Sequence, residues 1–526
     1  MKRISFFCLL VFLFSTVGFS QRGMPPMRQK KLDPIVQKML DEETNNSQLK
    51  QIAHELLDKI GPRLVGSPKM QQANDWAVAK YKSWGIDARN ENWGEWRGWE
   101  RGISHIDMVA PWVKSLAGTQ LAWSPSTKGK TITADVIILP DLADSLAYTA
   151  WMPSVKGKFV MINMAQPTGH PDSDWKEYGT EKSIKKMNDE RDSLTKAWAG
   201  RISKTGYNTR TLPAALEKAG AAGILTNYWS KEYGADKIFG ANTKTIPTVD
   251  ISLEDYGLVY RLVDNGTPVK LNIRTDSRET GVQTTYNTIA EIKGTEKPDE
   301  YVLLSAHFDS WDGGTGATDN GTGTLVMMEA MRLLKKFYPN PKRTIIVGHW
   351  GSEEQGLNGS KSFAEDHPEI MKGLQASFNQ DNGTGRVENI SGQGFLHAYE
   401  YLQRWLEAVP LDVKKDIKTT FPGFPSSGGT DNASFVAAGA PAFGLSSLSW
   451  GYFSNTWHTN LDTYDKVVFD DVQQNVILTA VLAYMASEDP SFFNREKSVL
   501  PVSPFTGQPG KWPQMSSPTR KGGLDK

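Results

Sequence analysis

Acidic and imidazole side chains follow three short apolar runs in the second half of the sequence. The runs span residues 301–306, 344–348 and 376–380, and the residues that follow them are His307, Asp309, Glu353, Glu354 and Asp381. Apolar runs of this length, separated by helical patterns, are typical of strands in a parallel sheet. Because ligands of open α/β sheets collect outside the carboxyl ends of the strands, we expect these side chains to share one rim of the sheet.

The chemistry of this set is that of a hydrolytic metal site. Imidazole and carboxylate ligands without thiolate suit zinc, with Co²⁺ or Mn²⁺ as substitutes. Two Zn²⁺ ions about 3.5–4 Å apart need a shared ligand, and Asp319, which lies just before a predicted helix, is the natural bridge. One ion would take His307 and Asp381, the other Glu354 and His458. Three carboxylates and one hydroxide cancel the charge of two divalent ions, which makes their burial tolerable.

Two further carboxylates have predicted roles beside these ligands. Successive side chains of an extended segment point in different directions, so Glu354 can bind metal while Glu353 faces the water that the ions hold. Glu353 is then the general base, which takes the proton of that water and delivers it to the leaving amine. Asp309, two residues after His307, is expected to accept the other ring N–H of His307.

Several other catalytic patterns are absent or weak. The sequence has no His-Glu-x-x-His motif and no Gly-x-Ser-x-Gly motif, which excludes a thermolysin-type zinc site and counts against a serine hydrolase. The glycines at Gly313, Gly314 and Gly316 are a weak nucleotide signature. The remaining histidines are interpreted as surface or packing residues: His54, His105, His170, His349, His367 and His397.

The elements that must position these groups alternate between strand and helix patterns. The sequence predicts strands at 301–306, 344–348, 376–380 and 441–445, and helices at 323–337 and 470–487. This alternation predicts an α/β fold, with a doubly wound, mostly parallel sheet and helices on both faces. Helical patterns in residues 33–60 and 68–84 precede a β-rich stretch from about residue 120 to residue 284.

Two features of the first half are interpreted as structural. Trp93, Trp96 and Trp99 indicate aromatic packing at a domain edge rather than a surface on which a ligand stacks. Residues 168–210 are rich in Lys, Asp and Glu and have little apolar periodicity, which predicts an exposed helical excursion.

Composition narrows the class of protein and its compartment. A chain of 526 residues is long enough for a large domain and at least one further module. Lys+Arg and Asp+Glu both number 59, so no global field favours nucleic acid or an anionic membrane. Lys2 and Arg3 precede an apolar run, which predicts a signal peptide over residues 1–21 and an exported mature chain without a membrane span. The only cysteine, Cys8, lies in this run, so cysteine catalysis and cysteine-bound zinc are excluded.

Five segments around the chemical residues resemble motifs of one family, in the family's order. They are HFDSWD at 307–312, DNGTG at 319–323, GSEEQG at 351–356, QDN at 380–382 and WHT at 457–459. The chain is therefore identified as a member of the zinc-dependent exopeptidases that include bacterial leucyl aminopeptidases, glutamate carboxypeptidase II and carboxypeptidase Q. The resemblance implies the same five ligands and the same base. The Ser-Trp-Asp at 310–312 is most similar to the carboxypeptidase Q branch, whose members act on short peptides with free amino termini.

The resemblance also implies a domain arrangement. Residues 22–119 and 285–490 would form the peptidase domain. Residues 120–284 resemble a protease-associated domain, which relatives insert between the first helices and the zinc-bearing core. We expect residues 491–526 to form a disordered tail, because residues 501–526 are rich in Pro, Ser, Gly and Lys. The sequence leaves a homodimer open.

Three questions stay open at this point. Glutaminyl cyclases share this core but bind a single zinc, and receptor-like relatives keep the fold without the ligands. The number of bound ions therefore distinguishes the classes: two ions favour the peptidase, one ion favours the cyclase and no ion favours the receptor. Trp457 stands where glutamate carboxypeptidase II has a Tyr that supports the oxyanion, so the oxyanion donor is unassigned. Asp312 and Asp431 could pair with a substrate ammonium, but the loop 425–431 could hold a substrate carboxylate. An aminopeptidase or dipeptidase is therefore favoured over a carboxypeptidase without being decided.

Overall fold

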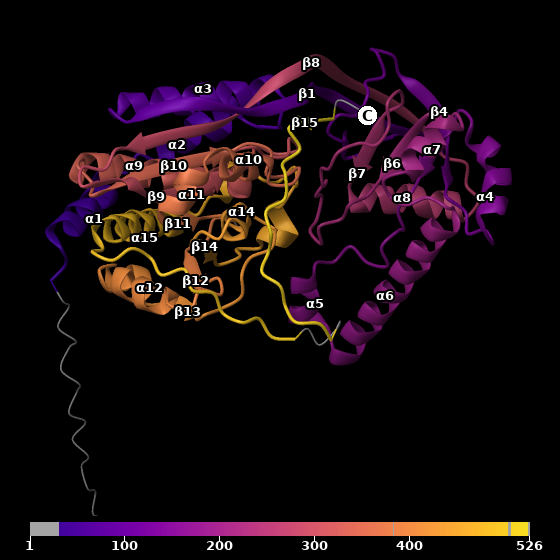
Figure 1. Ribbon diagram of the computed structural model, residues 1–526. Coiled ribbons are helices and arrows are strands. Elements are labelled where there is room, and N and C mark those ends of the chain that lie inside the picture. Colours follow the sequence, from indigo (N-terminus) through magenta and orange to yellow (C-terminus); the bar gives the residue numbers. More distant parts are fainter. Residues whose placement is uncertain (1–30, 382, 503–506, 524–526) are drawn as a thin grey trace, which may run out of the picture.

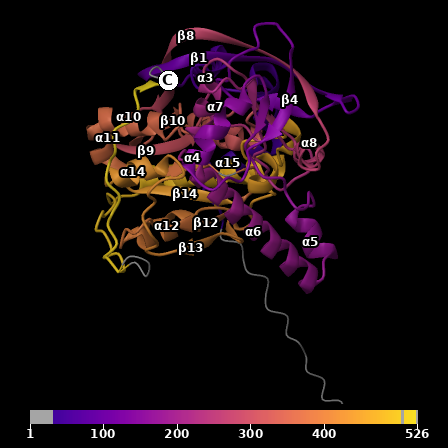
Figure 2. The same ribbon diagram turned by 90° about the vertical axis from the view of Figure 1, so that its right-hand side faces the viewer.

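The chain folds into a large α/β body and a second group of elements beside it (Figures 1 and 2). The structure, a computed structural model, describes residues 31–381, 383–502 and 507–523. The predicted signal peptide, residues 1–21, lies outside these residues. Within the described ranges, no helix combines the length and the apolar character that crossing a bilayer requires.

A mixed sheet forms the centre of the α/β body. Its strands, in spatial order, are β13 (Lys418–Thr420), β12 (Val387–Ser391), β14 (Ala442–Ser447), β11 (Leu374–Asn379), β9 (Lys297–His307), β10 (Arg343–Trp350) and β8 (Lys270–Ile292). The four strands between β12 and β8 are parallel, whereas β12 and β8 pair antiparallel at either side. The predicted α/β class with a mostly parallel inner sheet is confirmed.

Helices cover both faces of this sheet, and successive residues of the strands alternate between them. Val302 and Leu304 pack with α9 (Thr322–Phe337) and α15 (Phe469–Glu488), while Leu303 packs with α10 (Asn358–Asp366) and α14 (Asn432–Ala437). A strand buried on both faces needs apolar residues at every position, which explains the continuous run that predicted β9.

Further helices complete the body, and residues with strong capping preferences begin two of them. The helices are α1 (Pro34–Asn46), α2 (Leu49–Ala53), α3 (Pro68–Ser83), α11 (Pro368–Gly373), α12 (Ala398–Glu407) and α13 (Leu411–Lys414). Asp33 accepts the backbone N–H of Ile35, and Ser67 accepts that of Met70. Each cap precedes a proline at the first helical position, where the missing N–H costs nothing.

Two very long strands connect the body to the second group of elements. β1 (Asp87–Ala110) pairs antiparallel with β8 along almost its whole length, from Asp87 opposite Glu291 to Ala110 opposite Lys270, with several register shifts. One end of β8 pairs with β10 in the body, and the other end pairs with β4 (Ile132–Ile138). Trp93, Trp96 and Trp99 on β1 are all buried, which confirms the packing interpretation.

The second group of elements lies on the side of the molecule away from α1 and α15 (Figure 1). It contains β3 (Gly118–Gln120), β4, β5 (Phe159–Met161), β6 (Gly223–Thr226) and β7 (Thr248–Ile251), with α4 (Ser145–Trp151), α5 (Asp172–Tyr178), α6 (Glu181–Lys204), α7 (Leu212–Lys218) and α8 (Leu253–Asp264). We call residues 120–284 the insert. α6 is largely exposed, as its charged composition predicted. The assignment of the insert to a protease-associated domain stays a prediction.

The C-terminal segment differs from its prediction as a disordered tail. Residues 507–523, here called the strap, run along the body, and Figure 1 shows them in yellow. The Trp512 ring packs on Phe395 with ring centroids 5.4 Å apart, and Lys521–Gly522 (β15) pairs with β1. Arg520 forms ion pairs with two carboxylates at the end of α10. The composition predicted disorder, but the packing of Trp512 and the ion pairs of Arg520 hold the strap against the body.

The packing of α1 against α9 buries two carboxylates side by side. Glu43 is 1% exposed and Glu329 is fully buried. Arg332 donates to both oxygens of Glu329, whereas Glu43 accepts from the Ser47 hydroxyl at 2.7 Å. Burial, together with the neighbouring charge of Glu329, raises the pKa of Glu43 well above its ordinary 4.5. Glu43 is therefore protonated in the folded chain at pH values where an unfolded chain has lost that proton.

We expect Glu43→Gln to remove part of the pH dependence of stability. A carboxyl whose pKa rises on folding contributes stability that is fully present below its unfolded pKa and is lost as the pH rises through its folded pKa. Between about pH 5 and pH 8 the wild-type chain should lose stability relative to Glu43→Gln, by up to about 1.4 kcal/mol for each pH unit. Thermal unfolding at several pH values measures the difference.

Glu42→Gln is the matched control for this experiment. Hydrogen bonds from Lys336 and Arg332 lower the pKa of Glu42 to about 2. The stability that its carboxylate contributes to the folded chain is therefore present over the whole range from pH 5 to pH 8. This variant should be less stable than wild type by an amount that hardly changes with pH. A Glu43→Gln chain whose stability difference is equally flat would contradict the assignment.

Candidate metal centre

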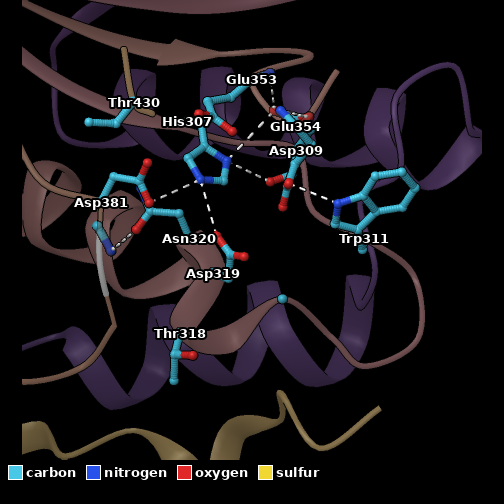
Figure 3. A network of polar contacts seen from close by, with 12 residues as sticks. His307, Asp309, Trp311, Thr318, Asp319, Asn320, Glu353, Glu354, Asp381 and Thr430 are labelled. Atoms are coloured by element: carbon cyan, nitrogen blue, oxygen red, sulfur yellow. Dashed lines mark hydrogen bonds and ion pairs between the residues drawn. The ribbon is translucent and has the colours of Figure 1, made fainter. Parts of the chain in front are cut away.

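The structure brings all five predicted ligands together at one rim of the sheet. Figure 3 shows four of them, His307, Asp319, Glu354 and Asp381. His307 ends β9, Glu354 follows β10, Asp381 follows β11, Asp319 lies in the turn before α9, and His458 follows a helical turn at Tyr452–Thr456. Ligand atoms within 4.8 Å of one another define two groups, which we call the first triad (His307, Asp319, Asp381) and the second triad (Asp319, Glu354, His458). Asp319 is common to both, which is the division predicted from the sequence.

The spacing of the ligand atoms matches the edge of a zinc tetrahedron. Nε2 of His307 lies 3.3 Å from Asp319 Oδ1 and 3.4 Å from Asp381 Oδ1. Nε2 of His458 lies 3.4 Å from Asp319 Oδ2 and 2.8 Å from Glu354 Oε2. Ligands about 2.0–2.1 Å from a tetrahedral zinc are separated by about 3.3 Å. Three of the four separations therefore suit zinc directly, and the fourth is shorter.

Electrostatics also favour cations here. Oδ2 of Asp319 and Oε1 of Glu354 are buried and accept no hydrogen bond from the described residues. Burial, with the charge of Asp319 next, raises the pKa of Glu354 well above the ordinary carboxyl range. Buried carboxylates this close together are costly unless cations pair with them. The donor set of nitrogen and oxygen without sulfur fits zinc, so the residues present suit the predicted ions.

Glu353 lies beside the centre without belonging to either triad. Burial raises the pKa of Glu353 well above its ordinary value, and the charge of Asp381 raises it further, while the charge of His307 opposes both. The backbone N–H of Glu353 donates to Asp309 Oδ1 at 3.0 Å, which fixes the turn that carries it. A carboxyl that is near the ligands but is not one of them is the arrangement that a general base needs.

Asp309 differs in part from its prediction. Nδ1 of His307 donates to the backbone oxygen of Asp309 at 3.0 Å, whereas the nearest carboxylate oxygen of Asp309 lies 3.7 Å away. The Asp309 carboxylate instead accepts the backbone N–H groups of Glu353 and Glu354. Asp309 therefore fixes the His307 ring through its main chain and the Glu-Glu turn through its side chain.

Three supporting residues of the centre were not predicted. Asp462 accepts the backbone N–H groups of Thr318 and Asp319, at 2.7 and 3.1 Å. Trp311 Nε1 donates to Glu354 Oε2 at 2.8 Å. Arg63 is fully buried and donates to four backbone oxygens, those of Gly61, Phe308, Thr315 and Gly316. A carboxylate four residues after the ligand His458 was the signal that could have identified Asp462.

Neither aspartate proposed for a substrate ammonium is open to solvent. Asp312 forms a two-point ion pair with Arg101, at 2.9 and 2.6 Å. Asp431 is fully buried, and burial raises its pKa. His349, interpreted from the sequence as a surface or packing residue, is hydrogen-bonded to the Tyr81 hydroxyl at 2.7 Å and belongs to neither triad.

A short segment of the insert reaches the centre. Residues 236–239, here called the insert loop, lie against the segment that carries His458. The Ile238 N–H donates to the backbone oxygen of His458 at 2.8 Å, and the Phe239 ring lies 5.1 Å from the His458 ring, centroid to centroid. Lys237 Nζ lies 4.2 Å from the centre of the Trp457 ring. More than 200 residues separate the two segments, so no sequence pattern indicated this contact.

Comparisons with known proteins find similarity to peptidases. The profile described as peptidase family M28 matches residues 287–483. Carboxypeptidase Q from Rattus norvegicus is 27% identical over 436 residues, covering 82% of this chain and 84% of that protein, and the Homo sapiens protein is 26% identical over 438 residues with the same coverage.

Solved structures show the same fold. A peptidase M28 precursor from Shewanella amazonensis has a TM-score of 0.66 and 25% identity, covering 89% of this chain and 98% of that chain. A zinc aminopeptidase from Bacillus subtilis has a TM-score of 0.54 and 19% identity, covering 89% of this chain and 98% of its own.

Proposed function

We propose, from the premise that this chain belongs to peptidase family M28, that it is a two-zinc exopeptidase that hydrolyses short peptides at a free amino terminus. One observation carries the proposal: two triads of zinc-type ligand atoms share a single carboxylate, that of Asp319. A shared carboxylate is what holds two ions at the separation that hydrolytic two-metal sites use.

The residues divide into those that hold the ions and one that moves a proton. His307, Asp319 and Asp381 would hold one zinc, and Asp319, Glu354 and His458 the other. Bound zinc supplies Lewis-acid chemistry, which polarises the scissile carbonyl and lowers the pKa of water. Glu353 accepts the proton of the attacking water at its carboxylate and returns it to the leaving amine. Burial of Glu353 suits both steps, because a raised pKa makes a carboxylate a stronger base.

The choice of the amino end rests on the resemblance of the Ser-Trp-Asp segment at 310–312 to the carboxypeptidase Q branch, whose members act on short peptides with free amino termini. The two aspartates considered for an ammonium do not decide the polarity, because Asp312 is paired with Arg101 and burial raises the pKa of Asp431. The names of the relatives point both ways, since the curated relatives are named carboxypeptidase and one solved structure is named a zinc aminopeptidase.

One dipeptide in four forms tests this function. With zinc-loaded protein, we expect cleavage of the free and the carboxy-amidated forms and no cleavage of the amino-acetylated or doubly blocked forms, because acetylation removes the free amino terminus that the proposed enzyme requires. A lost charge-assisted contact is worth about 1.5–3 kcal/mol, or at least about tenfold in kcat/KM. Release of amino acid, measured by chromatography, gives the rates.

Two other results of this assay would change the proposal. Cleavage of the acetylated form without cleavage of the amidated form would make the protein a carboxypeptidase. No cleavage of any form would favour a single-zinc cyclase or a receptor-like protein without activity.

Export is part of the proposal. Lys2, Arg3 and the apolar run that follows them support a signal peptide, which would deliver the enzyme to the periplasm or the medium. To test export, expressing cells are separated into cytoplasm, periplasm and medium, and each fraction is probed for the mature chain. The homodimer stays a prediction.

A further inference from the structure

The two histidine ligands are held in different ways. Nδ1 of His307 donates to the backbone oxygen of Asp309 at 3.0 Å, which fixes the ring in the plane of that bond. Nδ1 of His458 is buried and has no hydrogen-bond partner among the described residues. A metal-binding histidine is normally oriented by a bond to its second nitrogen. Something other than a hydrogen bond must therefore orient His458.

His458 also needs support for its backbone. Its φ is +61°, in the left-handed region that residues with a side chain rarely adopt without compensating contacts. The insert loop supplies such contacts. The Ile238 N–H donates to the His458 oxygen at 2.8 Å, and Asp236 and Asn460 exchange two further hydrogen bonds at 2.9 and 3.0 Å.

Aromatic rings hold the imidazole where a hydrogen bond does not. The neighbouring Trp457 ring covers one side of the His458 ring at 3.9 Å between centroids. Phe239 of the insert loop lies nearly perpendicular to the His458 ring, with centroids 5.1 Å apart, and Trp311 lies 5.7 Å away. Phe239 also packs on Trp311 at 5.8 Å. The indole N–H of Trp311 in turn donates to Oε2 of Glu354, and Oε1 of that ligand has no hydrogen-bond partner among the described residues. The rings of Phe239 and Trp311 therefore contact His458 and Glu354, the two ligands that belong to the second triad alone.

We propose that the insert loop, together with Trp311, positions the second triad and so sets the affinity of one of the two ions. The inference rests on the proposed function, because it concerns how zinc is retained. Phe239 and Trp311 act as positioning residues, since neither belongs to a triad. The ligands specific to the first triad are supported differently: the Asp309 main chain holds His307, and Asp381 follows β11 within the sheet. The insert is thus a structural part of one metal site and not of the other.

Titration of metal-free protein with zinc against a chromophoric chelator tests this. The wild-type chain should bind two ions, with two dissociation constants. Phe239→Leu removes the ring and keeps an apolar side chain, while Trp311→Phe keeps a ring and removes the N–H donor. Each variant should raise one dissociation constant by about 10–100-fold, the usual effect of losing a group that orients a ligand, and leave the other unchanged.

Adding Phe239→Leu to two variants, each of which keeps only one triad intact, identifies which metal site is affected. In His458→Ala the first triad alone is intact, and adding Phe239→Leu should not change the affinity of the ion that remains. In His307→Ala the second triad alone is intact, and the same addition should weaken the remaining ion. Trp229→Phe is the matched control, because it removes an indole N–H that donates to the Glu232 oxygen inside the insert at 3.0 Å. This control should leave both affinities unchanged.

The outcomes separate the inference from the function on which it rests. Wild-type protein that binds fewer than two ions contradicts the proposed function, and the inference fails with it. Two ions in the wild type with unchanged affinities in both variants, or with both affinities weakened equally, overturn the inference alone. Thermal unfolding of the metal-free variants shows whether an equal loss reflects a general loss of structure.

Discussion

Glu353→Gln lowers kcat by about 10²–10⁴-fold and leaves two zinc ions bound; this is the expected result of deleting a proton acceptor without deleting a ligand. Glutamine keeps the size of the side chain, and the backbone N–H that fixes the turn on Asp309 is unaffected. KM should change little, because Glu353 acts on water rather than holding the peptide. Steady-state kinetics and elemental analysis of the same sample measure both effects.

A surface carboxylate gives the matched control for this variant. Glu369 at the start of α11 is exposed and lies outside both triads, so Glu369→Gln should keep wild-type kcat and zinc content. The opposite pattern, with full turnover in Glu353→Gln and loss of one ion, would show that Glu353 and Glu354 exchange roles.

Asp319→Asn should have the second large effect, because Asp319 is the one residue that belongs to both triads. Replacing a charged bridge by a neutral amide removes a ligand from each ion and leaves the remaining ligands with less negative charge. We expect both dissociation constants for zinc to rise by more than about 100-fold, since the loss of a merely orienting group already costs about 10–100-fold. Turnover should fall to background at stoichiometric zinc.

Comparison with His307→Ala makes the bridging role testable. His307 belongs to the first triad alone, so its removal should weaken one ion and spare the other. If Asp319→Asn also weakens a single ion, Asp319 does not bridge, and the two-ion proposal needs a different shared ligand.

The sequence allowed the candidate metal ligands to be located because most of the signals were local. His307 ends one buried strand, and Glu354 and Asp381 follow two others within a few residues. A strand buried on both faces is visible as an uninterrupted apolar run. The rule that parallel strands present their carboxyl ends at one edge then brings the three together. Asp319 and His458 do not end strands, and they were identified by their motifs.

Contacts between distant segments had no such signal. β1 spans 24 residues and is rich in Trp, Arg, Glu and Gly, without the alternation of a half-buried strand. Its partner β8 begins 160 residues after β1 ends, so only the fold reveals the ladder. The orientation of Asp309 was missed for a different reason: its backbone oxygen and its carboxylate compete for the same ring nitrogen, and spacing cannot distinguish them.

Because the strap lies at the C-terminal end of the chain, its strand β15 can pair with β1 only late in synthesis. A chain leaves the ribosome from its N-terminus, so β1 emerges long before β8, and the edge of β1 at Glu95 and Trp96 receives β15 only when residues 521–522 are made. The insert loop likewise precedes its partner His458 by some 220 residues. The metal centre therefore cannot be complete before residue 458 has been made, and a nascent chain stalled before β15 would leave part of β1 unpaired.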